Sequence, residues 1–388
     1  MIRVLRIINR FNLGGITYNV SYLSKYLPGE YETLLIGGPE EEGEESSLYI
    51  PESMRLQPLV IEEMRRSIDP FRDIKAYQRI KKIIKDFKPD IVHTHASKAG
   101  AIGRLAAIHC KVPVIVHTFH GHVFHGYFRP SKTEIFKKLE RYLASKSTAI
   151  IAISELQKKE LTLDHQICKN DKINVVPLGF DLKRFTEGMD EKRSSFRNRN
   201  KLENNELIIG IIGRLAPIKN HALFLEAIAG LKKESKQAFK ALIIGDGETR
   251  QELEELVKQK EISDVVLFTG WIKEVDVALA GLDIVALSSK NEGTPVSLIE
   301  AQAAGKFVVS TNVGGISDIL HPDCGLLSER DDHQGFINNL RSAVENFQVY
   351  NQKAGAARNS VLEKFSYQRL CRDMDNLYKK LLKENSKP

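Results

Sequence analysis

The sequence predicts an α/β protein made of two Rossmann-like domains, each built on a parallel sheet. The first observation is that short apolar runs of strand length alternate with longer stretches of helical spacing. The second is that this alternation occurs twice in the 388 residues and starts afresh at 207–214, L-I-I-G-I-I-G-R, after a polar segment at 188–206. A chain of this length accommodates two or three domains. We therefore expect one domain at 1–178 and a second at 179–366.

The first domain opens with a strand at 3–9, a glycine turn and a helix at 18–27. The turn, N-L-G-G-I-T, lacks the G-x-G-x-x-G spacing of a dinucleotide site, which disfavours a dehydrogenase. Gly14 and Gly15 would let backbone N–H groups point at an anionic ligand from close range. The alternative is a plain tight turn without a ligand.

The rest of the first domain continues the alternation of strands and helices. We expect strands at 32–36, 90–94, 112–118, 148–153 and 173–176, helices at 73–88, 98–109 and 133–145, and an exposed acidic loop at 37–57. The helix at 133–145 is basic and amphipathic, with one apolar side. That side consists of Ile135, Phe136, Leu139 and Leu143.

Four histidines follow closely on one another at the end of the strand at 112–118, in H-T-F-H-G-H-V-F-H-G-Y-F-R-P. A metal site is disfavoured because the segment has neither an H-E-x-x-H helix nor a carboxylate at ligand spacing. We expect His117 and His122 to be buried and hydrogen-bonded in this aromatic loop. His120 stands just past the strand end, before Gly121.

The second domain opens with a strand at 207–212 that ends in Gly213-Arg214. Arg214 and Lys219 lie on the loop that leads into a helix at His221. Two cations on such a loop can neutralise a diphosphate, the arginine with its planar fork and the lysine as a point charge. Further elements are expected as strands at 241–244, 265–269 and 324–327, a helix at 249–260, and Trp271 just past the strand that ends at 269.

Residues 282–315 are the stretch around which the second domain is organised. Their elements are a strand at 282–287, a helix at 296–304, a strand at 307–310 and a closing Gly314-Gly315. We expect Thr294 to cap the helix and Pro295 to take its first position, where the missing N–H has no helical partner. Gly305 is suited to the place just past the helix end. Together these elements predict a right-handed crossover in a parallel sheet.

The loop and the helix of this stretch carry one carboxylate each. Glu292 lies in the loop, and Glu300 lies less than two turns into the helix. Ligands of open parallel sheets bind beyond the carboxyl ends of the strands, where a helix N-terminus favours a phosphate. A carboxylate at each place can accept hydrogen bonds from sugar hydroxyls. The alternative is a solvated loop glutamate and a surface helix glutamate.

The net charge of +7 belongs entirely to the first 178 residues, which hold 27 Lys+Arg and 20 Asp+Glu. The remaining 210 residues hold 30 of each. A basic surface is compatible with nucleic acid, but the chain has no nucleic-acid motif. An anionic membrane surface or an anionic acceptor is the better fit.

Other whole-chain features concern the location of the protein. No apolar run approaches the roughly 20 residues that span a bilayer. The start of the chain, M-I-R-V-L-R-I-I-N-R, has alternating arginines and no cleavage site, so it predicts a first strand and not a signal peptide. The cysteines at 110, 168, 324 and 371 share no metal-like spacing. We expect a reducing, cytoplasmic location, with peripheral attachment to the inner face of the membrane as an open alternative.

At this point the sequence resembles a known family. The segment E-G-T-P-V-S-L-I-E-A-Q-A-A-G, 292–305, is similar to the donor-binding motif of retaining GT-B glycosyltransferases of the large family four, the nucleotide-sugar-dependent group 1 enzymes. The resemblance extends over nearly the whole chain. It implies two Rossmann-like domains whose parallel sheets face each other across a cleft, the first binding the acceptor and the second the donor. It also implies that a last helix, 367–388, crosses back onto the first domain, and that P-L-G-F-D-L-K-R-F at 177–185 is a hinge, with Leu178 where Asn is more common.

The resemblance also assigns roles to individual residues. His120 rather than His122 would contact and orient the donor sugar, and Gly14-Gly15 would reach the donor diphosphate. The residues expected to flank the acceptor are Phe124, Tyr127, Phe128 and Arg129. The residues expected to bind the donor in the second domain are Gly213, Arg214, Lys219, Trp271, Ile272, Glu292, Gly293, Thr294, Pro295 and Glu300. Catalytic roles would fall to His120, Glu292, Arg214 and Lys219, with no metal and no cofactor.

The expected reaction is transfer, with retention, of a hexosyl or N-acetylhexosaminyl unit from a nucleotide-diphosphate sugar. UDP is favoured over GDP on family frequency, and the expected acceptor is a glycan, a lipid-linked or another cell-surface polysaccharide precursor. One alternative is a nucleotide-sugar 2-epimerase on a similar fold, which needs no acceptor. The other is a non-catalytic nucleotide-binding module, which is disfavoured because all four charged residues of the donor motifs are present: Arg214, Lys219, Glu292 and Glu300.

Overall fold

The computed structural model describes residues 1–12, 15–42, 44–121 and 130–385. The chain divides into two compact units. The first comprises Met1–Phe180 together with the C-terminal segment from Phe365, and the second comprises Asp181–Lys364. Each unit is described by itself below.

The first unit is built on a parallel sheet of seven strands within the described residues, in the order β3-β2-β1-β4-β5-β6-β7. The strands are β1 (Ile2–Arg10), β2 (Tyr31–Gly38), β3 (Leu59–Val60), β4 (Ile91–His95), β5 (Val114–Phe119), β6 (Ala149–Ala152) and β7 (Ile173–Val175). The strand order reverses between β1 and β4, which is the doubly wound arrangement of a Rossmann-like sheet. Ligands of such sheets bind beyond the carboxyl ends of the strands at that reversal.

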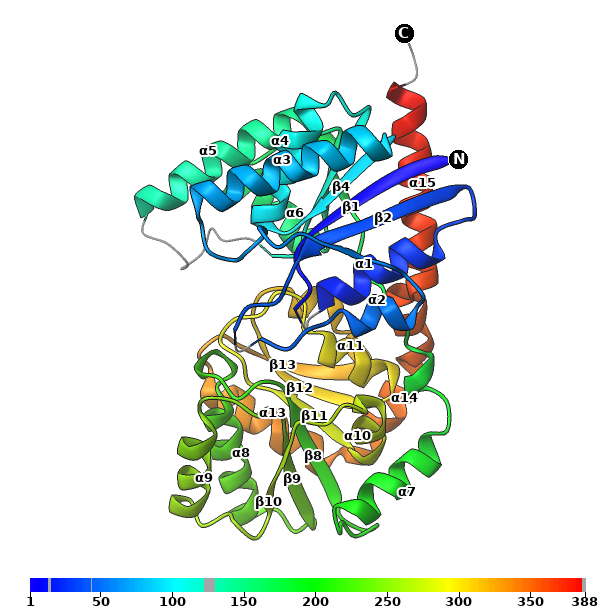
Figure 1. Cartoon of the computed structure of the whole chain (residues 1–388). Helices are drawn as coiled ribbons and strands as arrows, with labels where there is room; N and C mark the ends of the chain where they lie inside the picture. Colours follow the sequence, from blue (N-terminus) through cyan, green and yellow to red (C-terminus); the bar gives the residue numbers. More distant parts are fainter. Residues whose placement is uncertain (13–14, 43, 122–129, 386–388) are drawn as a thin grey trace. The chain divides into compact units, whose positions relative to one another are not determined.

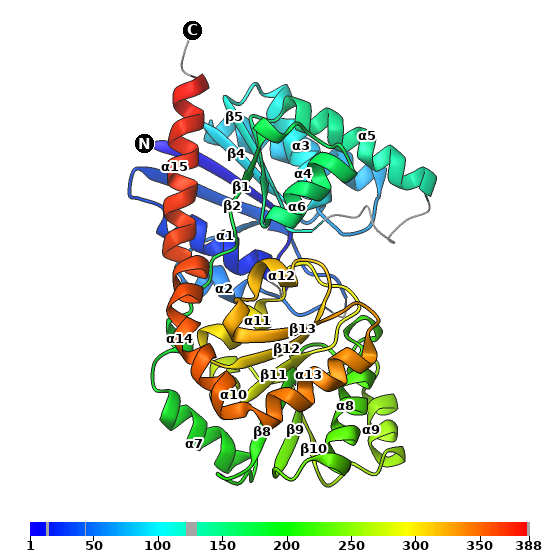
Figure 2. The ribbon, with the colours of Figure 1, turned by 180° about the vertical axis from the view of Figure 1, so that it is seen from behind.

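Helices cover both faces of this sheet. They are α1 (Gly15–Tyr26), α2 (Tyr49–Ser53), α3 (Pro70–Phe87), α4 (Ser97–His109), α5 (Pro130–Lys146), α6 (Glu155–Lys159) and α15 (Tyr367–Asn385). Figure 1 shows α3, α4 and α5 over one face, and Figure 2 shows α15 running over the other. The short α2 lies inside 37–57, the segment expected to be an exposed loop, and it buries Ile50.

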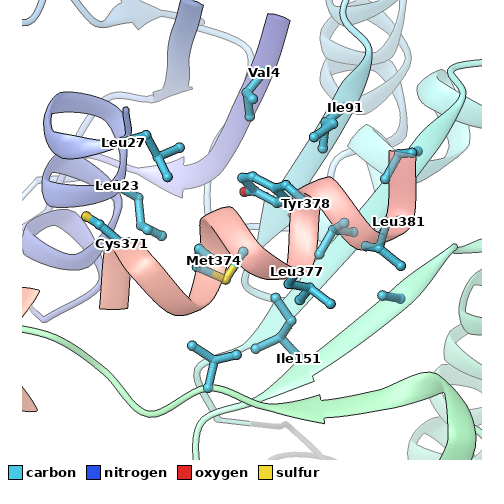
Figure 3. Packing of buried hydrophobic residues seen from close by; sticks show 14 of the residues in the cluster. Val4, Leu23, Leu27, Ile91, Ile151, Cys371, Met374, Leu377, Tyr378 and Leu381 are labelled. Atoms are coloured by element: carbon cyan, nitrogen blue, oxygen red, sulfur yellow. The ribbon is translucent and has the colours of Figure 1, made fainter. Parts of the chain in front are cut away.

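The last helix, α15, is part of the core of the first unit. Its buried residues Leu370, Met374, Leu377, Tyr378 and Leu381 follow helical spacing. Figure 3 shows Met374, Leu377, Tyr378 and Leu381 against side chains of α1 and of the strands β1, β4 and β6. Fully burying one such apolar side chain contributes roughly 1.5–3 kcal/mol. The C-terminal segment is therefore an integral layer of the first unit and not an appendage.

The apolar side predicted for the helix α5 is only partly buried in the structure. Ile135 is 66% exposed and Leu139 is 36% exposed, whereas Leu143 is fully buried. The inward side also carries Glu140, which forms an ion pair of 2.6 Å with Arg104, a residue with no exposed surface. The inward side of α5 is therefore partly polar, and Ile135 and Leu139 of its apolar side face solvent.

The second unit, which is described throughout, has a six-stranded parallel sheet in the order β10-β9-β8-β11-β12-β13. The strands are β8 (Leu207–Ile212), β9 (Phe239–Ile244), β10 (Val266–Gly270), β11 (Ile284–Leu287), β12 (Phe307–Asn312) and β13 (Gly325–Glu329). The helices are α7 (Met189–Arg199), α8 (His221–Glu234), α9 (Arg250–Gln259), α10 (Val275–Gly281), α11 (Val296–Ala303), α12 (Ile316–Ile319), α13 (His333–Glu345) and α14 (Phe347–Phe365). Each predicted strand of this domain is found within three residues at either end, and the order again reverses, here between β8 and β11. The predicted α/β class with two Rossmann-like sheets is confirmed.

The polar segment at 188–206 contains a helix that apolar periodicity did not predict. In α7, Arg197 is buried and donates to Asp283 at 2.6 Å, while Arg193 pairs with the same carboxylate at 2.8 Å. Phe196 packs on α10, where it leaves room only for the glycine at 281. Buried ion pairs, more than an apolar stripe, therefore hold α7 in place. None of the described helices of the chain combines the length and the apolarity that a membrane span requires.

Candidate functional site

The second unit gathers charged residues at the carboxyl edge of its sheet. The loops after β8 and β11 lie side by side because these two strands are hydrogen-bonded neighbours. Lys219 Nζ, from the first loop, donates to Glu292 Oε1, from the second, at 2.6 Å. Ser289 Oγ donates to the same carboxylate oxygen, also at 2.6 Å. The structure thus brings together two predicted site residues and adds Ser289, a fully buried hydroxyl that the sequence did not single out.

The loop that carries Glu292 is held from the other side by the glycine pair after β12. Gly314 has a φ of +58°, and a Cβ there would collide with the carbonyl oxygen of Glu292. Gly315 N donates to Gly293 O at 3.0 Å, and a Cβ at Gly315 would press on that oxygen as well. The close approach of the two backbones explains why the crossover ends in two glycines.

The start of α11 differs from the sequence prediction by one position. Pro295 has φ −70° and ψ 107°, an extended conformation, and it is the N-cap residue of a helix that begins at Val296. The predicted N-cap at Thr294 and first helical position at Pro295 were therefore wrong. Proline at the cap has no side-chain acceptor, so no side chain caps the first turn of α11. Its N–H groups lie beside the Glu292 loop, at the edge where an anion is expected. Gly305, with a φ of +70°, ends the helix as predicted.

Glu300 lies on α11 and is largely buried, with 14% of its side chain exposed. Burial raises the pKa of its carboxyl to about 7, and the nearby guanidinium of Arg184 opposes this shift. Arg184 Nη2 is 3.4 Å from Glu300 Oε1. Arg184 comes from the segment that was predicted to be a hinge, so this segment contributes a neighbour to the predicted donor residues. Near neutral pH the carboxyl is partly protonated and can donate as well as accept a hydrogen bond.

Arg214 is exposed and makes no hydrogen bond or ion pair with the described part of the chain. Its loop is supported by the G-D-G segment after β9. Gly245 and Gly247 have φ angles of +140° and +157°, and a Cβ at either would collide with the carbonyl oxygens of Gly213 and Leu215, respectively. This segment was not predicted to have a role, although two glycines with one residue between them after a strand indicate such a contact. Arg214 is thus presented to solvent on a loop of fixed backbone.

The predicted nucleobase contacts lie further along the same edge. Trp271 is 65% exposed and follows β10, the edge strand, and Ile272 is half-buried. One strand, β9, separates β10 from β8. Two strand spacings amount to roughly 10 Å, so the two residues are not part of the Lys219–Glu292 group.

Part of the predicted site in the first unit lies outside the described residues, namely Gly14, His122, Phe124, Tyr127, Phe128 and Arg129. Gly15 is the first residue of α1. His117 is fully buried, and its Nδ1 is 2.8 Å from Thr94 Oγ1, which confirms the expected buried, hydrogen-bonded histidine. Burial holds the pKa of His117 well below its usual value.

His120 lies just past β5, at the carboxyl edge of the first sheet, as expected. Its Nε2 is 2.9 Å from Nδ1 of His95, the last residue of β4. Burial lowers the pKa of His120 to about 4, so its ring is neutral at pH 7. His95 was not among the predicted site residues. The available signal was H-T-H at the end of a strand, because alternate residues of a strand face the same side.

The chain has two Rossmann-like sheets, and the carboxyl edge of the second sheet carries an Arg/Lys loop and a loop–helix pair of glutamates. Together these features define the GT-B class of sugar-transferring enzymes. Comparison with family models agrees. The model "Glycosyltransferase Family 4" matches residues 13–184, and the model "Glycosyl transferases group 1" matches residues 192–360. The chain belongs to the group 1 glycosyltransferases of GT-B fold, and it is a transferase of the glycosyl-transferring class.

Individual relatives agree with this assignment. The chain is 30% identical to the UDP-Gal:alpha-D-GlcNAc-diphosphoundecaprenol alpha-1,3-galactosyltransferase of Escherichia coli, and the match covers 85% of each protein. It is 26% identical to the capsular polysaccharide biosynthesis glycosyltransferase CapM of Staphylococcus aureus, and the match covers 83% of this chain and 85% of CapM.

Solved structures show the same fold at lower identity. A glycosyltransferase from Rickettsia africae superposes with a TM-score of 0.83 at 22% identity, over 98% of this chain and 99% of that one. HepE of Anabaena, in complex with UDP, superposes with a TM-score of 0.83 at 17% identity, over 98% of this chain and all of that one.

Proposed function

We propose that this chain is a retaining glycosyltransferase that moves a hexosyl or N-acetylhexosaminyl unit from a UDP-sugar to a glycan or lipid-linked precursor of a cell-surface polysaccharide. The observation that carries the proposal is the group at the carboxyl edge of the second sheet. There Lys219 and Glu292 are in contact, beside the uncapped start of α11 and the free Arg214. UDP is the proposed nucleotide because the Escherichia coli relative is named for a UDP-Gal donor and the HepE structure contains UDP.

In this proposal the donor binds to the second unit. Arg214, Lys219 and the first N–H groups of α11 contact the diphosphate, with Gly213, Gly293, Thr294 and Pro295 shaping the loops around it. Lys219 can do so while keeping its bond to Glu292, because an ammonium group has three N–H donors. The carboxyl of Glu300 accepts hydrogen bonds from the ribose, and the exposed ring of Trp271, with Ile272, packs against the base.

The proposed mechanism places the leaving-group charge on protein donors. When the bond between sugar and phosphate breaks, Arg214, Lys219 and backbone N–H groups, with Gly14-Gly15 of the first unit, stabilise the departing diphosphate without a metal ion. The acceptor attacks from the same face as the leaving group, and a donor phosphate oxygen takes its proton. Glu292 and His120 contact the reacting sugar. Because Oε1 of Glu292 already accepts from Lys219 and Ser289, its Oε2 is the oxygen available to the sugar.

We also propose that the first unit binds the acceptor and attaches weakly to anionic membranes. The +7 net charge lies in its first 178 residues. The outward side of α5 carries an apolar stripe at helical spacing, Ile135, Leu139 and Tyr142, which are 66%, 36% and 49% exposed. Lys138 and Arg141 lie on the same helix. An apolar stripe with neighbouring cations suits a surface of anionic lipids.

The proposal is tested by ligand binding and by product analysis. In a thermal-shift screen with UDP, GDP and ADP and their sugars, the UDP compounds should give the largest stabilisation. Incubation of a UDP-sugar with a synthetic GlcNAc-diphospholipid, followed by NMR, should show an α-linked product formed together with UDP. Conversion of the UDP-sugar to its C2 epimer without acceptor would instead identify an epimerase. Binding of UDP with neither transfer nor epimerisation, for any acceptor of a glycan panel, would point to a binding module.

A further inference from the structure

We propose that an open pocket in the first unit, between the end of α5 and the segment 160–172, binds the phosphate-bearing headgroup of an anionic phospholipid. The pocket has a volume of about 830 Å³. This volume lies within the range of roughly 300–1,000 Å³ that is usual for small-molecule sites. The inference deepens the proposed attachment to anionic membranes, on which it rests, and it does not depend on the proposed sugar transfer.

The pocket lies at the amino edge of the first sheet, away from the predicted acceptor site. Thr148 lines it and directly precedes β6, and Lys172 lines it and directly precedes β7. His120 lies at the opposite edge, just past the carboxyl end of β5, the neighbour of β6. Because β5 has six residues, roughly 20 Å separate the two edges. The pocket is therefore a site of its own and not an extension of the predicted catalytic site.

Two cationic side chains tie the walls of the pocket together. Nε and Nη2 of Arg141, on α5, donate to the carbonyl oxygens of Gln166 and His165 at 3.1 Å and 2.9 Å. From the opposite wall, Nζ of Lys172 donates to the carbonyl oxygen of Ser145 at 2.7 Å. Each of these bonds joins α5 to the segment before β7. The two walls are thus held at a fixed separation.

The pocket has an excess of positive charge. Arg141, Lys169 and Lys172 line it, and Asp171 is the one carboxylate of the lining. None of the three cations forms an ion pair within the part of the chain that the structure describes. Burial lowers the pKa of the Lys172 ammonium, as expected for a cation whose charge is not fully compensated. The Lys172 ammonium has three N–H donors and uses one on Ser145, so two remain for phosphate oxygens.

Apolar groups in the same pocket favour a lipid over a free phosphate ion. Ala144 and Ile167 line the pocket with buried side chains, and Leu163 lines it with a side chain that is 64% exposed. A small anion would leave Leu163 in water. The glycerol and the first methylene groups of a phospholipid would cover it, and covering apolar surface is favourable.

The pocket also continues the apolar stripe that is proposed to face the membrane. Ser145, which lines the pocket, follows Tyr142 by three residues, and its Oγ donates to the carbonyl oxygen of Tyr142 at 2.7 Å. Residues three or four apart lie on the same side of a helix. The stripe of Ile135, Leu139 and Tyr142 therefore leads to the pocket. A bilayer in contact with the stripe would present its headgroups there, so the source of the phosphate is a membrane lipid.

The direct test is calorimetric titration of the full chain with dihexanoyl-phosphatidylglycerol below its micelle concentration. Dihexanoyl-phosphatidylcholine has the same chains without the net charge, and glycerol 3-phosphate has the phosphate without the chains. We expect saturable binding of the phosphatidylglycerol, at least about tenfold tighter than that of either comparison compound. Equal binding of the phosphatidylcholine, equal binding of glycerol 3-phosphate, or no saturable binding of the phosphatidylglycerol would each overturn the inference.

Variants place the lipid in the pocket. Lys169→Gln with Lys172→Gln removes two charges from the lining, whereas Lys158→Gln with Lys159→Gln removes two charges from α6, outside the lining. We expect binding of dihexanoyl-phosphatidylglycerol to weaken about tenfold or more in the first pair and to stay unchanged in the second. If the first pair lowers Tm, Lys169→Gln alone serves instead, because its side chain is exposed. Equal affinities in the pocket variant and in the control pair would overturn the placement.

Two further measurements separate the pocket from the functions proposed above. In flotation with vesicles that contain phosphatidylglycerol, the pocket variants should be released at lower salt than the control pair. Turnover of UDP-sugar with a short-chain GlcNAc-diphospholipid should match wild type in all of them, because the pocket lies at the far edge of the sheet. Salt-sensitive flotation of wild type without binding of the lipid monomer would overturn the pocket and leave the attachment. Binding of the monomer without flotation would support the pocket and contradict the attachment.

Discussion

Glu300 is a residue whose burial is costly for the folded protein. Its carboxyl has a pKa of about 7 in the folded state, above the ordinary value of 4.5. Below pH 4.5 it is protonated in both the folded and unfolded states and does not affect stability. Between these pH values the unfolded chain releases the proton more readily, so the folded state loses stability as pH rises, until the full penalty is reached above pH 7.

The first prediction follows from that penalty. Glu300→Gln, which cannot ionise, should raise the free energy of unfolding at pH 8 by on the order of 1–3 kcal/mol relative to wild type. At pH 4.5 the two proteins should differ far less. Thermal unfolding of both proteins across this range is the measurement. A difference between them that does not change with pH would show that the carboxyl is not desolvated.

The second prediction separates the two glutamates of the donor motif by their kinetics. Glu300→Ala should raise the donor KM with a small effect on kcat, because a ribose contact is similar in the ground and transition states. Glu292→Ala and His120→Ala should lower kcat more, because these side chains are proposed to contact the reacting sugar. Glu252→Ala, an exposed residue of α9, serves as the control. An unchanged donor KM in Glu300→Ala would contradict the role given to α11.

At the scale of elements, the loops of the second unit owe their shape to glycines that touch backbone. The third prediction is that Gly314→Ala lowers kcat/KM at least tenfold and also lowers Tm. The new Cβ would displace the carbonyl of Glu292, and the alanine would have to adopt the positive φ of this position. Gly355→Ala, on α14 with no atom within 4 Å of the new Cβ, should retain activity and gain roughly 0.5–1 kcal/mol of stability. The prediction fails if the two variants behave alike.

The strands and the helices were not equally predictable from sequence patterns. Apart from the two-residue edge strand β3, which was not predicted, the strands of both sheets were predictable because parallel strands covered on both faces are continuous apolar runs. The outward stripe of α5 and the existence of α7 were not, because buried ion pairs, Arg104–Glu140 and Arg197–Asp283, hold these helices. Single-residue patterns do not reveal such pairs, since the partners are far apart in the chain.

The site was predictable to a similar degree. The contact of Lys219 with Glu292 follows from the position of their loops after neighbouring strands, and both residues were predicted from motifs. The contacts of Ser289 with Glu292 and of His95 with His120 depend on tertiary structure. The roles of Gly245 and Gly247 also required the structure, because only the structure shows which loop approaches them.

At the scale of the whole molecule, the distribution of charge sets the fourth prediction. The protein should float with vesicles that contain anionic phospholipid at 0.1 M salt and should be released at 1 M, because the Debye length falls from about 10 Å to roughly 3 Å. Replacing Ile135, Leu139 and Tyr142 by Ser should reduce the bound fraction. Val349→Ser, which removes an exposed apolar residue of α14, is the control. Binding that is absent at low salt, or insensitive to salt, would contradict the proposal.

The central claim is that the donor diphosphate departs onto Arg214 and Lys219 of the second unit and not onto a bound cation. The most direct measurement is turnover of UDP-sugar with a GlcNAc-diphospholipid in excess chelator, for wild type, Arg214→Ala and Lys219→Ala. We expect full wild-type turnover with chelator and a loss of about 10²–10³ in kcat for each variant, the usual effect of removing one donor from a preorganised site. Loss of wild-type turnover in chelator, with recovery on adding Mg²⁺ or Mn²⁺, would contradict it.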